Sequence, residues 1–350
     1  MARGIPYART PTEARCPACL NDRGEVLYAV TSEQSAQHSV VREANPERHD
    51  ALRAHIEHLW GGATCRLVAC TRCGFTFADP FVSGDHRFFD LAYEREGYPA
   101  WRWEFDVTRR VLRDAYGAEG LRRAHLLELG AGDGAFARAV VPADMPAEHV
   151  LCTEFSDYGL RTIRAAGIAA VDGDVRALGP EHDGRFDVVC MFQIMEHLDD
   201  FDGLFARLGT LTKQAAHLFI TVPNGRRIEF NERHGSLLDM PPNHTGRWTR
   251  GAFEALAART GWAVADHRIE PEGALSKARE LMTYTYMRNR QEGGTVENRV
   301  AALPKGPVRR ALQIALAASN GVRRAPEIAE MIRRPDIGGT QWAHLTRSAA

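Results

Sequence analysis

The chain has 350 residues, of which 44% are hydrophobic and 25% are charged, a composition typical of globular proteins and not of disordered or fibrous ones. This length fits about two domains of average size. The formal net charge of -1 gives no overall positive field, which favours a small-molecule substrate over a nucleic-acid partner. No segment reaches the ~18 apolar residues of a membrane-spanning helix, and the N-terminus lacks the apolar core of a signal peptide. We therefore expect a cytoplasmic protein with no membrane partner; the oligomeric state stays open.

Four of the seven cysteines form two C-x2-C pairs, Cys16 with Cys19 and Cys70 with Cys73. Each pair places two thiolates on one tight turn, which is the spacing that a tetrahedral zinc site requires. We therefore predict a structural zinc ion in an N-terminal zinc-ribbon domain over residues 1–84. Because four protein ligands leave no open coordination position, this ion would stabilise the fold and take no part in chemistry. The alternative is four buried free cysteines.

The segment between the two cysteine pairs is long for a zinc ribbon. It contains a predicted amphipathic helix over about residues 45–60, followed by strands on both sides of the second pair. Other residues in this segment could replace a zinc ligand, although four cysteines already suffice: His49, His55, His58 and Cys65.

Residues 85–120 carry many aromatic side chains at helical spacing and predict a helical connector that ends at Gly117 and Gly120. Aromatic residues of this segment, Tyr98 and Trp101 among them, either belong to the core or cover a ligand at the domain boundary. The sequence leaves both readings open.

Beyond residue 120, short apolar runs alternate with helical patterns, which is typical of a doubly wound α/β fold with a parallel sheet. Ligands of such folds bind at the carboxyl ends of the strands. The first run leads into "ELGAGDG", which contains Gly130, Gly132 and Gly134. These glycines fit more than one class of nucleotide cofactor, so the motif alone does not identify the ligand.

Acidic residues near the strand ends narrow the choice. Glu128, two residues before the first glycine, suits a cationic group such as an ammonium and would sit awkwardly beside a pyrophosphate. Glu154 ends the second strand, where a carboxylate can accept hydrogen bonds from ribose hydroxyls. Asp174 ends the third strand and can accept from an adenine amino group, with Phe155 and Val175 packed on the ring.

Together with "EHLDD" after the fourth strand and "VPN" after the fifth, these motifs resemble the class I S-adenosylmethionine-dependent methyltransferases over residues 121–270. The stretch "PPNHTGRWT" is similar to the small-molecule subgroup. The cysteine pairs resemble the zinc ribbon that precedes the methyltransferase domain in some sugar C-methyltransferases and related natural-product enzymes. The long insertion between the pairs and the C-terminal region depart from the sugar enzymes. The acceptor therefore stays open, as does the choice among O-, N- and C-methylation.

The resemblance implies a Rossmann-like sheet of seven strands and methyl transfer by in-line displacement to a natural product, a sugar or another secondary metabolite. S-adenosylmethionine would be the cofactor, and the methyltransferase core would span residues 121–274. The implied cofactor-binding residues are Glu128, Gly130, Ala131, Gly132, Gly134, Glu154, Phe155, Asp174, Val175, Phe192 and Gln193.

The C-terminal part shows helical periodicity over residues 275–335, followed by a closing strand within residues 336–350. We expect this strand to pair antiparallel with a strand at residues 263–270. The helical segment would then be an insertion that forms a lid over the cleft.

A neutral histidine near the transferred methyl group is the natural proton acceptor at physiological pH. His244, in the loop after the fifth strand, is the favoured candidate, and His197, after the fourth strand, is the second. Glu196 and Tyr98 are lesser candidates. Either histidine could instead be structural, through a hydrogen bond to the backbone or a contact that fixes its loop.

Two other functions stay open. A nicotinamide-dependent oxidoreductase would share the glycine loop and Glu154 with a methyltransferase. A zinc-ribbon interaction protein with a decayed cofactor fold would lack the glycines and acids that this chain retains. A nucleic-acid methyltransferase is disfavoured, because the sequence shows no basic stripe.

Overall fold

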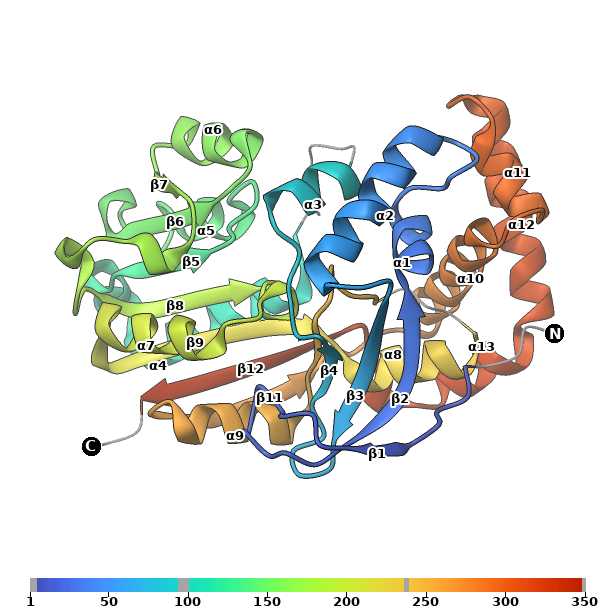
Figure 1. Ribbon diagram of the computed structural model, residues 1–350. Coiled ribbons are helices and arrows are strands. Elements are labelled where there is room, and N and C mark those ends of the chain that lie inside the picture. The colour runs from blue at the N-terminus through green and yellow to red at the C-terminus, as the bar shows by residue number, and fades with distance from the viewer. Residues whose placement is uncertain (1–4, 94–100, 236–238, 348–350) are drawn as a thin grey trace.

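The computed structural model describes residues 5–93, 101–235 and 239–347 (Figure 1). Its larger sheet has seven strands in the order β11-β12-β9-β8-β5-β6-β7. The neighbours from β9 to β7 pair in parallel, whereas β12 is antiparallel to both β9 and β11. This confirms the predicted Rossmann-like α/β fold with a seven-stranded sheet. The strands are β5 (Leu126–Leu129), β6 (Val150–Glu154), β7 (Ala169–Asp172), β8 (Phe186–Phe192), β9 (Thr212–Pro223), β11 (Trp262–Ile269) and β12 (Thr340–Arg347).

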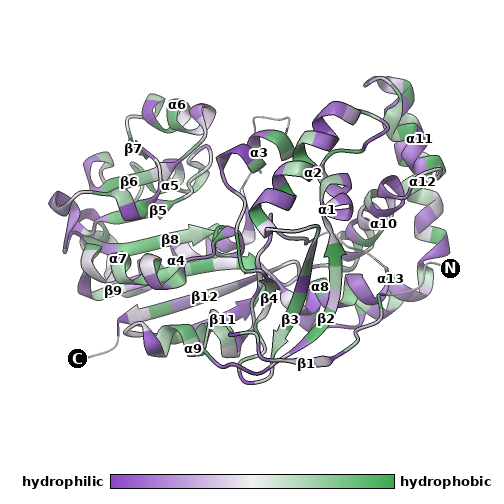
Figure 2. Ribbon diagram, viewed as in Figure 1, coloured by the Kyte–Doolittle hydropathy of each residue, from purple (hydrophilic) through white to green (hydrophobic). Residues whose placement is uncertain are grey.

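Both faces of this sheet are covered, which explains why its inner strands read as continuous apolar runs. On one face, residues of β8 and β9 share a core with α7 (Phe201–Leu211) and α9 (Arg250–Arg259). On the other face they meet α4 (Trp103–Arg123), α5 (Ala135–Val140) and α6 (Asp157–Ala165). Figure 2 shows the hydrophobic character of β8 directly. The short helices η1 (Ala147–His149), η2 (Val175–Ala177), η3 (Pro180–His182), η4 (Met195–His197) and η5 (Pro335–Ile337) lie in the connections.

Helix α4 is longer than the sequence indicated. It continues past Gly117 and Gly120 and ends at Arg123. The break expected at Gly117 is present as a kink: this residue has a non-helical φ of 62° and ψ of 177°, and two helical segments meet there. Glycine adopts such a conformation without strain.

The second sheet is antiparallel, in the order β1-β2-β3-β4-β10. Its strands are β1 (Thr10–Thr12), β2 (Gly24–Thr31), β3 (Thr64–Cys70), β4 (Thr76–Asp79) and β10 (Gly246–Arg247). The predicted strands beside the second cysteine pair are confirmed, whereas β2 was not predicted. β10 comes from the segment after β9 and pairs with β4, so a strand of the C-terminal half completes the N-terminal sheet.

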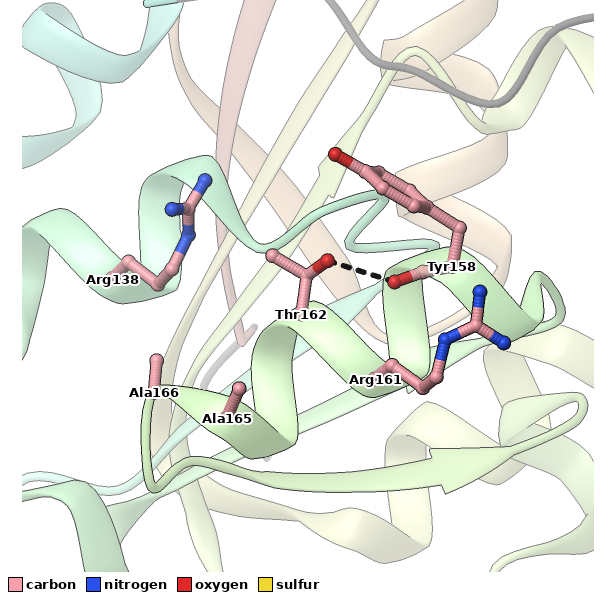
Figure 3. A pocket seen from close by; sticks show the side chains of 6 residues that line it. All are labelled: Arg138, Tyr158, Arg161, Thr162, Ala165 and Ala166. Atoms are coloured by element: carbon pink, nitrogen blue, oxygen red, sulfur yellow. Dashed lines mark hydrogen bonds between the residues drawn. The ribbon is translucent and has the colours of Figure 1, made fainter.

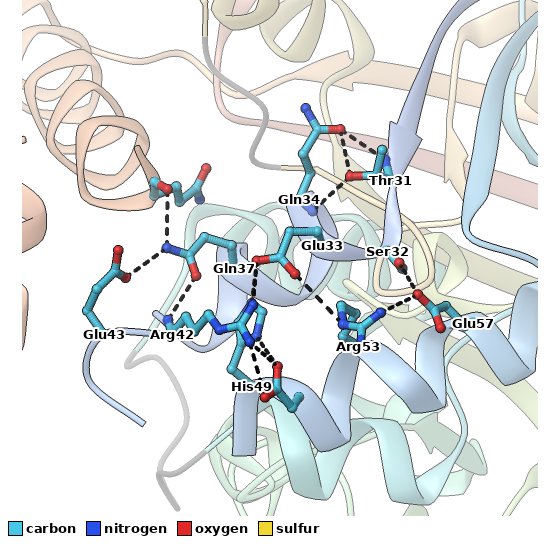
Figure 4. A network of polar contacts seen from close by, with 12 residues as sticks. Thr31, Ser32, Glu33, Gln34, Gln37, Arg42, Glu43, His49, Arg53 and Glu57 are labelled. Atoms are coloured by element: carbon cyan, nitrogen blue, oxygen red, sulfur yellow. Dashed lines mark hydrogen bonds and ion pairs between the residues drawn. The ribbon is translucent and has the colours of Figure 1, made fainter. Parts of the chain in front are cut away.

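Helices α1 (Ser32–Ser39), α2 (Pro46–Trp60) and α3 (His86–Ala92) accompany this sheet. The helix expected over about residues 45–60 is confirmed, with Asn45 as its N-cap and Gly61 at its end. A polar network joins α1 to α2 (Figure 4). In it, Ser32 and Arg53 both donate to the carboxylate of Glu57, at 2.8 and 2.7 Å.

Four helices fill the predicted C-terminal insertion: α10 (Ala274–Gln291), α11 (Val296–Ala302), α12 (Pro307–Arg323) and α13 (Ala325–Ile332). In Figure 1 they stand on the far side of the five-stranded sheet from β5, β6 and β7. α10 contacts α1, where Gln291 Nε2 lies 2.7 Å from His38 Nδ1. α10 and α13 also pack against α8 (Gly225–Arg233), around Phe230. Within the described ranges, none of the helices combines the length and apolar character needed to cross a membrane.

Candidate functional site

The glycine loop after β5 has the backbone that the sequence motif requires. Gly130, Gly132 and Gly134 have φ values of 57°, 59° and 74°, in the left-handed region that glycine enters without a steric penalty. A Cβ atom on Gly130 would lie 2.2 Å from Ile194 Cδ1. The loop is therefore tightly packed against the segment that follows β8, and larger residues would force the two apart.

Glu154 ends β6 and holds this loop. Its Oε2 accepts a hydrogen bond from the Gly132 N–H at 2.7 Å, and its Oε1 accepts from the Ser156 N–H at 2.9 Å. The residue is 7% exposed. Because each carboxylate oxygen has two lone pairs, the same group can also accept from the hydroxyls of a ligand at this strand end.

Glu128 is buried in β5, beneath the loop. Its Oε2 accepts from the Ala137 N–H at 3.0 Å, which satisfies one of the free N–H groups at the start of α5. Burial raises the pKa of this carboxyl to about 8. The sequence-based idea that Glu128 meets a cationic group stays a prediction, since its contact here is with the backbone.

The residues expected around adenine lie at the ends of β6 and β7. Phe155 is 58% exposed, so its ring is available for packing, whereas Val175 is buried. The carboxylate of Asp174 already accepts from the Arg176 guanidinium, with both oxygens at 2.8 Å from its nitrogens. An adenine amino group would have to share or displace this partner.

The remaining predicted cofactor residues surround the loop. The Ala131 N–H donates to the Thr153 carbonyl at 3.0 Å and so ties the loop to β6. Phe192, at the end of β8, packs against Phe105 and Phe136 with ring centroids 4.9 Å apart in both cases. Gln193 has φ of 59°, which is unusual for a residue with a side chain.

An open pocket of about 640 Å³ lies between α5 and α6 (Figure 3). Arg138, Tyr158 and Arg161 contribute to its wall, and Thr162 Oγ1 donates to the Tyr158 carbonyl at 2.8 Å. None of the predicted cofactor residues lines it. We therefore do not place the cofactor there.

Three of the four proposed catalytic side chains converge at the carboxyl edge of the large sheet. Glu196 and His197 belong to η4, directly after β8, and His244 comes from the loop before β10. One potential ligand atom of each lies within 4.8 Å of the others. Glu196 is 2% exposed, and its Oε2 has no hydrogen-bond partner among the described residues. The fourth candidate, Tyr98, lies outside the described residues.

The two histidines differ in their partners. His197 Nδ1 lies 2.6 Å from the Asn243 carbonyl, which can only accept, so Nδ1 carries the proton and Nε2 the lone pair. Burial lowers the pKa of His197 to about 3, which keeps its ring neutral. The backbone contact considered from the sequence as a structural role for His197 therefore exists, while its Nε2 lies 3.9 Å from Glu196 Oε1.

His244 pairs with Asp239, whose Oδ1 lies 2.9 Å from His244 Nδ1. Burial alone would lower the pKa of His244, but the hydrogen bond and charge of Asp239, with the charge of Glu196, raise it above its usual value. Sequence reasoning missed Asp239, because nothing in its local pattern marks it. It also missed Tyr93, whose hydroxyl donates to Asn243 Oδ1 at 3.0 Å.

The four paired cysteines come together at one end of the five-stranded sheet. Cys16 Sγ lies 3.7 Å from Cys73 Sγ, Cys19 Sγ lies 3.5 Å from Cys70 Sγ, and all four sulfurs are within 4.8 Å of one another. A zinc–sulfur distance of about 2.3 Å implies about 3.8 Å between the sulfurs of a tetrahedral site. The tetrad therefore fits such an ion.

The possible substitute ligands lie elsewhere. His49 is fully buried, with Nε2 3.4 Å from the Glu33 carboxylate in the network between α1 and α2. His55 Nε2 lies 2.7 Å from Asp85 Oδ1. Cys65 belongs to a separate apolar cluster, where burial raises the pKa of its thiol to about 12. Among the described residues, the tetrad consists of the four paired cysteines alone.

Comparison with known proteins agrees with this fold. Residues 100–267, just under half of the chain, match the family model of a methyltransferase domain. A search of curated proteins finds no significant match. Among solved structures, the chain is similar to phosphoethanolamine N-methyltransferase 2 from Haemonchus contortus in complex with S-adenosyl-L-methionine, with 15% identity and a TM-score of 0.43 over 75% of this chain and 58% of that one.

Two further structures are similar at the same level. The cyclase SpnF has 14% identity and a TM-score of 0.42 over 93% of this chain and 99% of that one. An S-adenosylmethionine-dependent methyltransferase from Mesorhizobium loti has 16% identity and a TM-score of 0.41 over 68% of this chain and 96% of that one. Because these scores are low, the fold assignment rests on the strand order described above. Residues 100–267 are thus similar to a methyltransferase domain, and the strand order of the large sheet is that of a Rossmann-like fold.

Proposed function

We propose that the chain transfers the methyl group of S-adenosylmethionine to a small-molecule acceptor, such as a natural product, a sugar or another secondary metabolite. One observation carries the proposal: the glycine loop after β5 packs against Ile194, and the cluster of Glu196, His197 and His244 begins two residues later. A cofactor site and a set of proton-accepting groups therefore share the carboxyl edge of the sheet, where such folds bind ligands.

The cofactor, when bound, supplies a methyl group that its own sulfonium has already activated. The residues around the loop fit such a ligand. The left-handed glycines give the loop its tight turn, and Glu154 has lone pairs for two ribose hydroxyls. Phe155 presents an exposed ring for adenine, and Asp174, at the end of the neighbouring strand, could accept from the adenine amino group by sharing its carboxylate with Arg176.

His244 is the proposed proton acceptor. Its Nδ1–H is held by Asp239, which leaves the Nε2 lone pair for an acceptor hydroxyl, amine or acidic carbon. The Asp239 carboxylate also stabilises the ring once it has gained the proton. Neutral His197 and buried Glu196 line the same space and would orient the acceptor.

Helix α10 carries Tyr284, whose pKa is raised by burial first and then by the charges of Glu280 and Asp239. We propose that the insertion containing α10 contributes to the choice of acceptor, as segments beside a cleft commonly do.

Binding and turnover test the proposal directly. Calorimetry should show S-adenosylmethionine binding with micromolar affinity, and mass spectrometry should show S-adenosylhomocysteine formed when a metabolite extract supplies the acceptor. Under the same conditions neither NAD nor NADP should bind. Binding of a nicotinamide cofactor, together with hydride transfer and no affinity for S-adenosylmethionine, would instead establish an oxidoreductase.

We also propose that the cysteine tetrad holds one structural Zn²⁺ per chain. Elemental analysis of the purified protein should give about one zinc, and Cys19→Ser should lower both the zinc content and the melting temperature, because metal binding and folding are coupled. Cys65→Ala is the matched control, since it changes a buried cysteine outside the tetrad and should leave the zinc content unchanged. Folded, active protein that contains no zinc would refute the site.

A further inference from the structure

A buried arginine lies two residues after the loop that carries His244. Arg247, in β10, is 5% exposed. Its guanidinium faces Glu232 in bidentate fashion, with Nη1 2.9 Å from Oε2 and Nη2 2.6 Å from Oε1. Nη2 also lies 2.7 Å from the Tyr28 hydroxyl and 3.2 Å from the Asp239 carbonyl. One side chain thus connects the N-terminal sheet to the residue that pairs with His244.

Glu232 is the centre of this buried group. It is 1% exposed in α8 and accepts from Arg247, from the Tyr28 hydroxyl and, at 2.6 Å, from the Tyr7 hydroxyl. Desolvating such an ion pair costs free energy that an apolar substitute would not require, so its presence is weak evidence for stability alone. A role in fixing geometry accounts better for the arrangement.

The loop from Asp239 to Thr245 is held at both ends. The Arg247 guanidinium donates to the carbonyl at its start, and the Thr245 N–H at its end donates to the Glu196 carbonyl at 2.7 Å. Between them, the His244 N–H donates to the Met240 carbonyl at 3.1 Å. The first of these contacts holds the backbone of Asp239, and the side chain of the same residue meets the His244 ring.

We infer that Arg247 is a positioning residue for the Asp239–His244 pair, and that Tyr28 of the N-terminal sheet anchors it. The inference rests on the proposed role of His244 as proton acceptor. If it holds, the N-terminal sheet contributes to catalysis through Tyr28 and does more than stabilise the fold.

The charge around His244 makes the inference measurable. Asp239 and Glu196 favour its protonated form, whereas burial and the charge of Arg247 oppose it. Arg247→Lys keeps a positive charge but loses the planar fork that binds Glu232 and the Asp239 carbonyl together. A change in the pKa of His244 in this variant is then attributed to displacement of the Asp239 carboxylate, since the positive charge at residue 247 is kept.

NMR titration of the histidines in the full-length protein measures the pKa of His244 directly and needs no methyl acceptor. In Arg247→Lys, the pKa of His244 should fall by about one pH unit, because a carboxylate that moves away favours the charged ring less. Asp239→Asn should cause a fall of at least the same size. Affinity for S-adenosylmethionine, measured by calorimetry, should stay as in the wild type.

Two tyrosine variants give a matched pair that does not depend on the folding of Arg247→Lys. Tyr28→Phe removes a hydroxyl that contacts both Arg247 and Glu232. It should lower the pKa of His244 by less than Arg247→Lys does. Tyr7→Phe removes a hydroxyl that contacts Glu232 but not Arg247, and should leave it unmoved. Equal shifts in both tyrosine variants, or an unmoved titration in folded Arg247→Lys, would overturn the inference. Slow transfer in His244→Gln is a separate result, so failure of the proposed base is distinguishable from failure of the anchor.

Discussion

His244→Gln is expected to slow methyl transfer by about a hundredfold or more in a single turnover, with the affinity for S-adenosylmethionine unchanged. Glutamine has similar size and can still hydrogen-bond to Asp239, but it cannot take up a proton. Rapid-quench measurement of the first turnover gives the rate, and calorimetry gives the affinity. His197→Gln is the control: its ring stays neutral and is bound to a backbone carbonyl, so its effect should be smaller. If neither variant slows the first turnover, alignment alone drives the transfer.

The rate of methyl transfer is expected to increase with pH. His244 accepts a proton only when it is neutral, so the transfer rate should rise with pH. Because Asp239 and Glu196 raise the pKa of His244, the rise should lie above the usual histidine value of about 6.5. Asp239→Asn should move the rise to lower pH and reduce the plateau. Glu196 is the rival group, since burial raises its pKa to about 7. Loss of the pH dependence in Glu196→Gln, but not in His244→Gln, would assign the base to Glu196.

Glu154→Ala is expected to weaken binding of S-adenosylmethionine by about a hundredfold, which corresponds to about 2–3 kcal/mol for hydrogen bonds to a charged group. Two effects combine in this variant: the ribose hydroxyls lose an acceptor, and the Gly132 and Ser156 N–H groups lose theirs. Asp172→Ala provides the control, because Asp172 ends the neighbouring β7 opposite Glu154 but is exposed. Its affinity should match the wild type.

A cofactor analogue that lacks both ribose hydroxyls separates the two effects. It should bind the wild type weakly, and Glu154→Ala should weaken it only slightly further, because the contact in question is already absent. If the variant weakens the analogue as much as it weakens S-adenosylmethionine, Glu154 acts through the loop and not through ribose.

The sequence predicted the large sheet well because its inner strands are buried on both faces and are therefore mostly apolar. The glycine loop and Glu154 were also predictable, since left-handed backbone and a carboxylate at a strand end leave a local pattern. β10 was not, because two residues become a strand only through pairing with Phe77 and Thr76 of a distant segment. Asp239 was not predicted for a similar reason: its contact with His244 depends on how a loop folds and not on local sequence.

The helical segment near the C-terminus illustrates the same division. The helical periodicity of the sequence predicted that these helices exist, but their position in the molecule depends on tertiary packing. α10 contacts α1 through Gln291 and His38, and the helices α10 to α13 stand on the far side of the five-stranded sheet from β5, β6 and β7 in Figure 1. The lid over the cleft that the sequence suggested stays a prediction.

The pairing of β10 with β4 also has a consequence for how the protein unfolds. Cys16, Cys70 and Cys73 pack in the same apolar core as Leu218 of β9 and Trp262 of β11, so this shared core couples the cysteine-bearing segment to the large sheet, although a second apolar cluster around Cys65 lies mostly within the N-terminal segment. Heating should therefore produce a single cooperative transition, and removal of the metal should lower it as a whole. A cassette cut after residue 84 could not be exchanged between enzymes without also rebuilding the loop that holds His244.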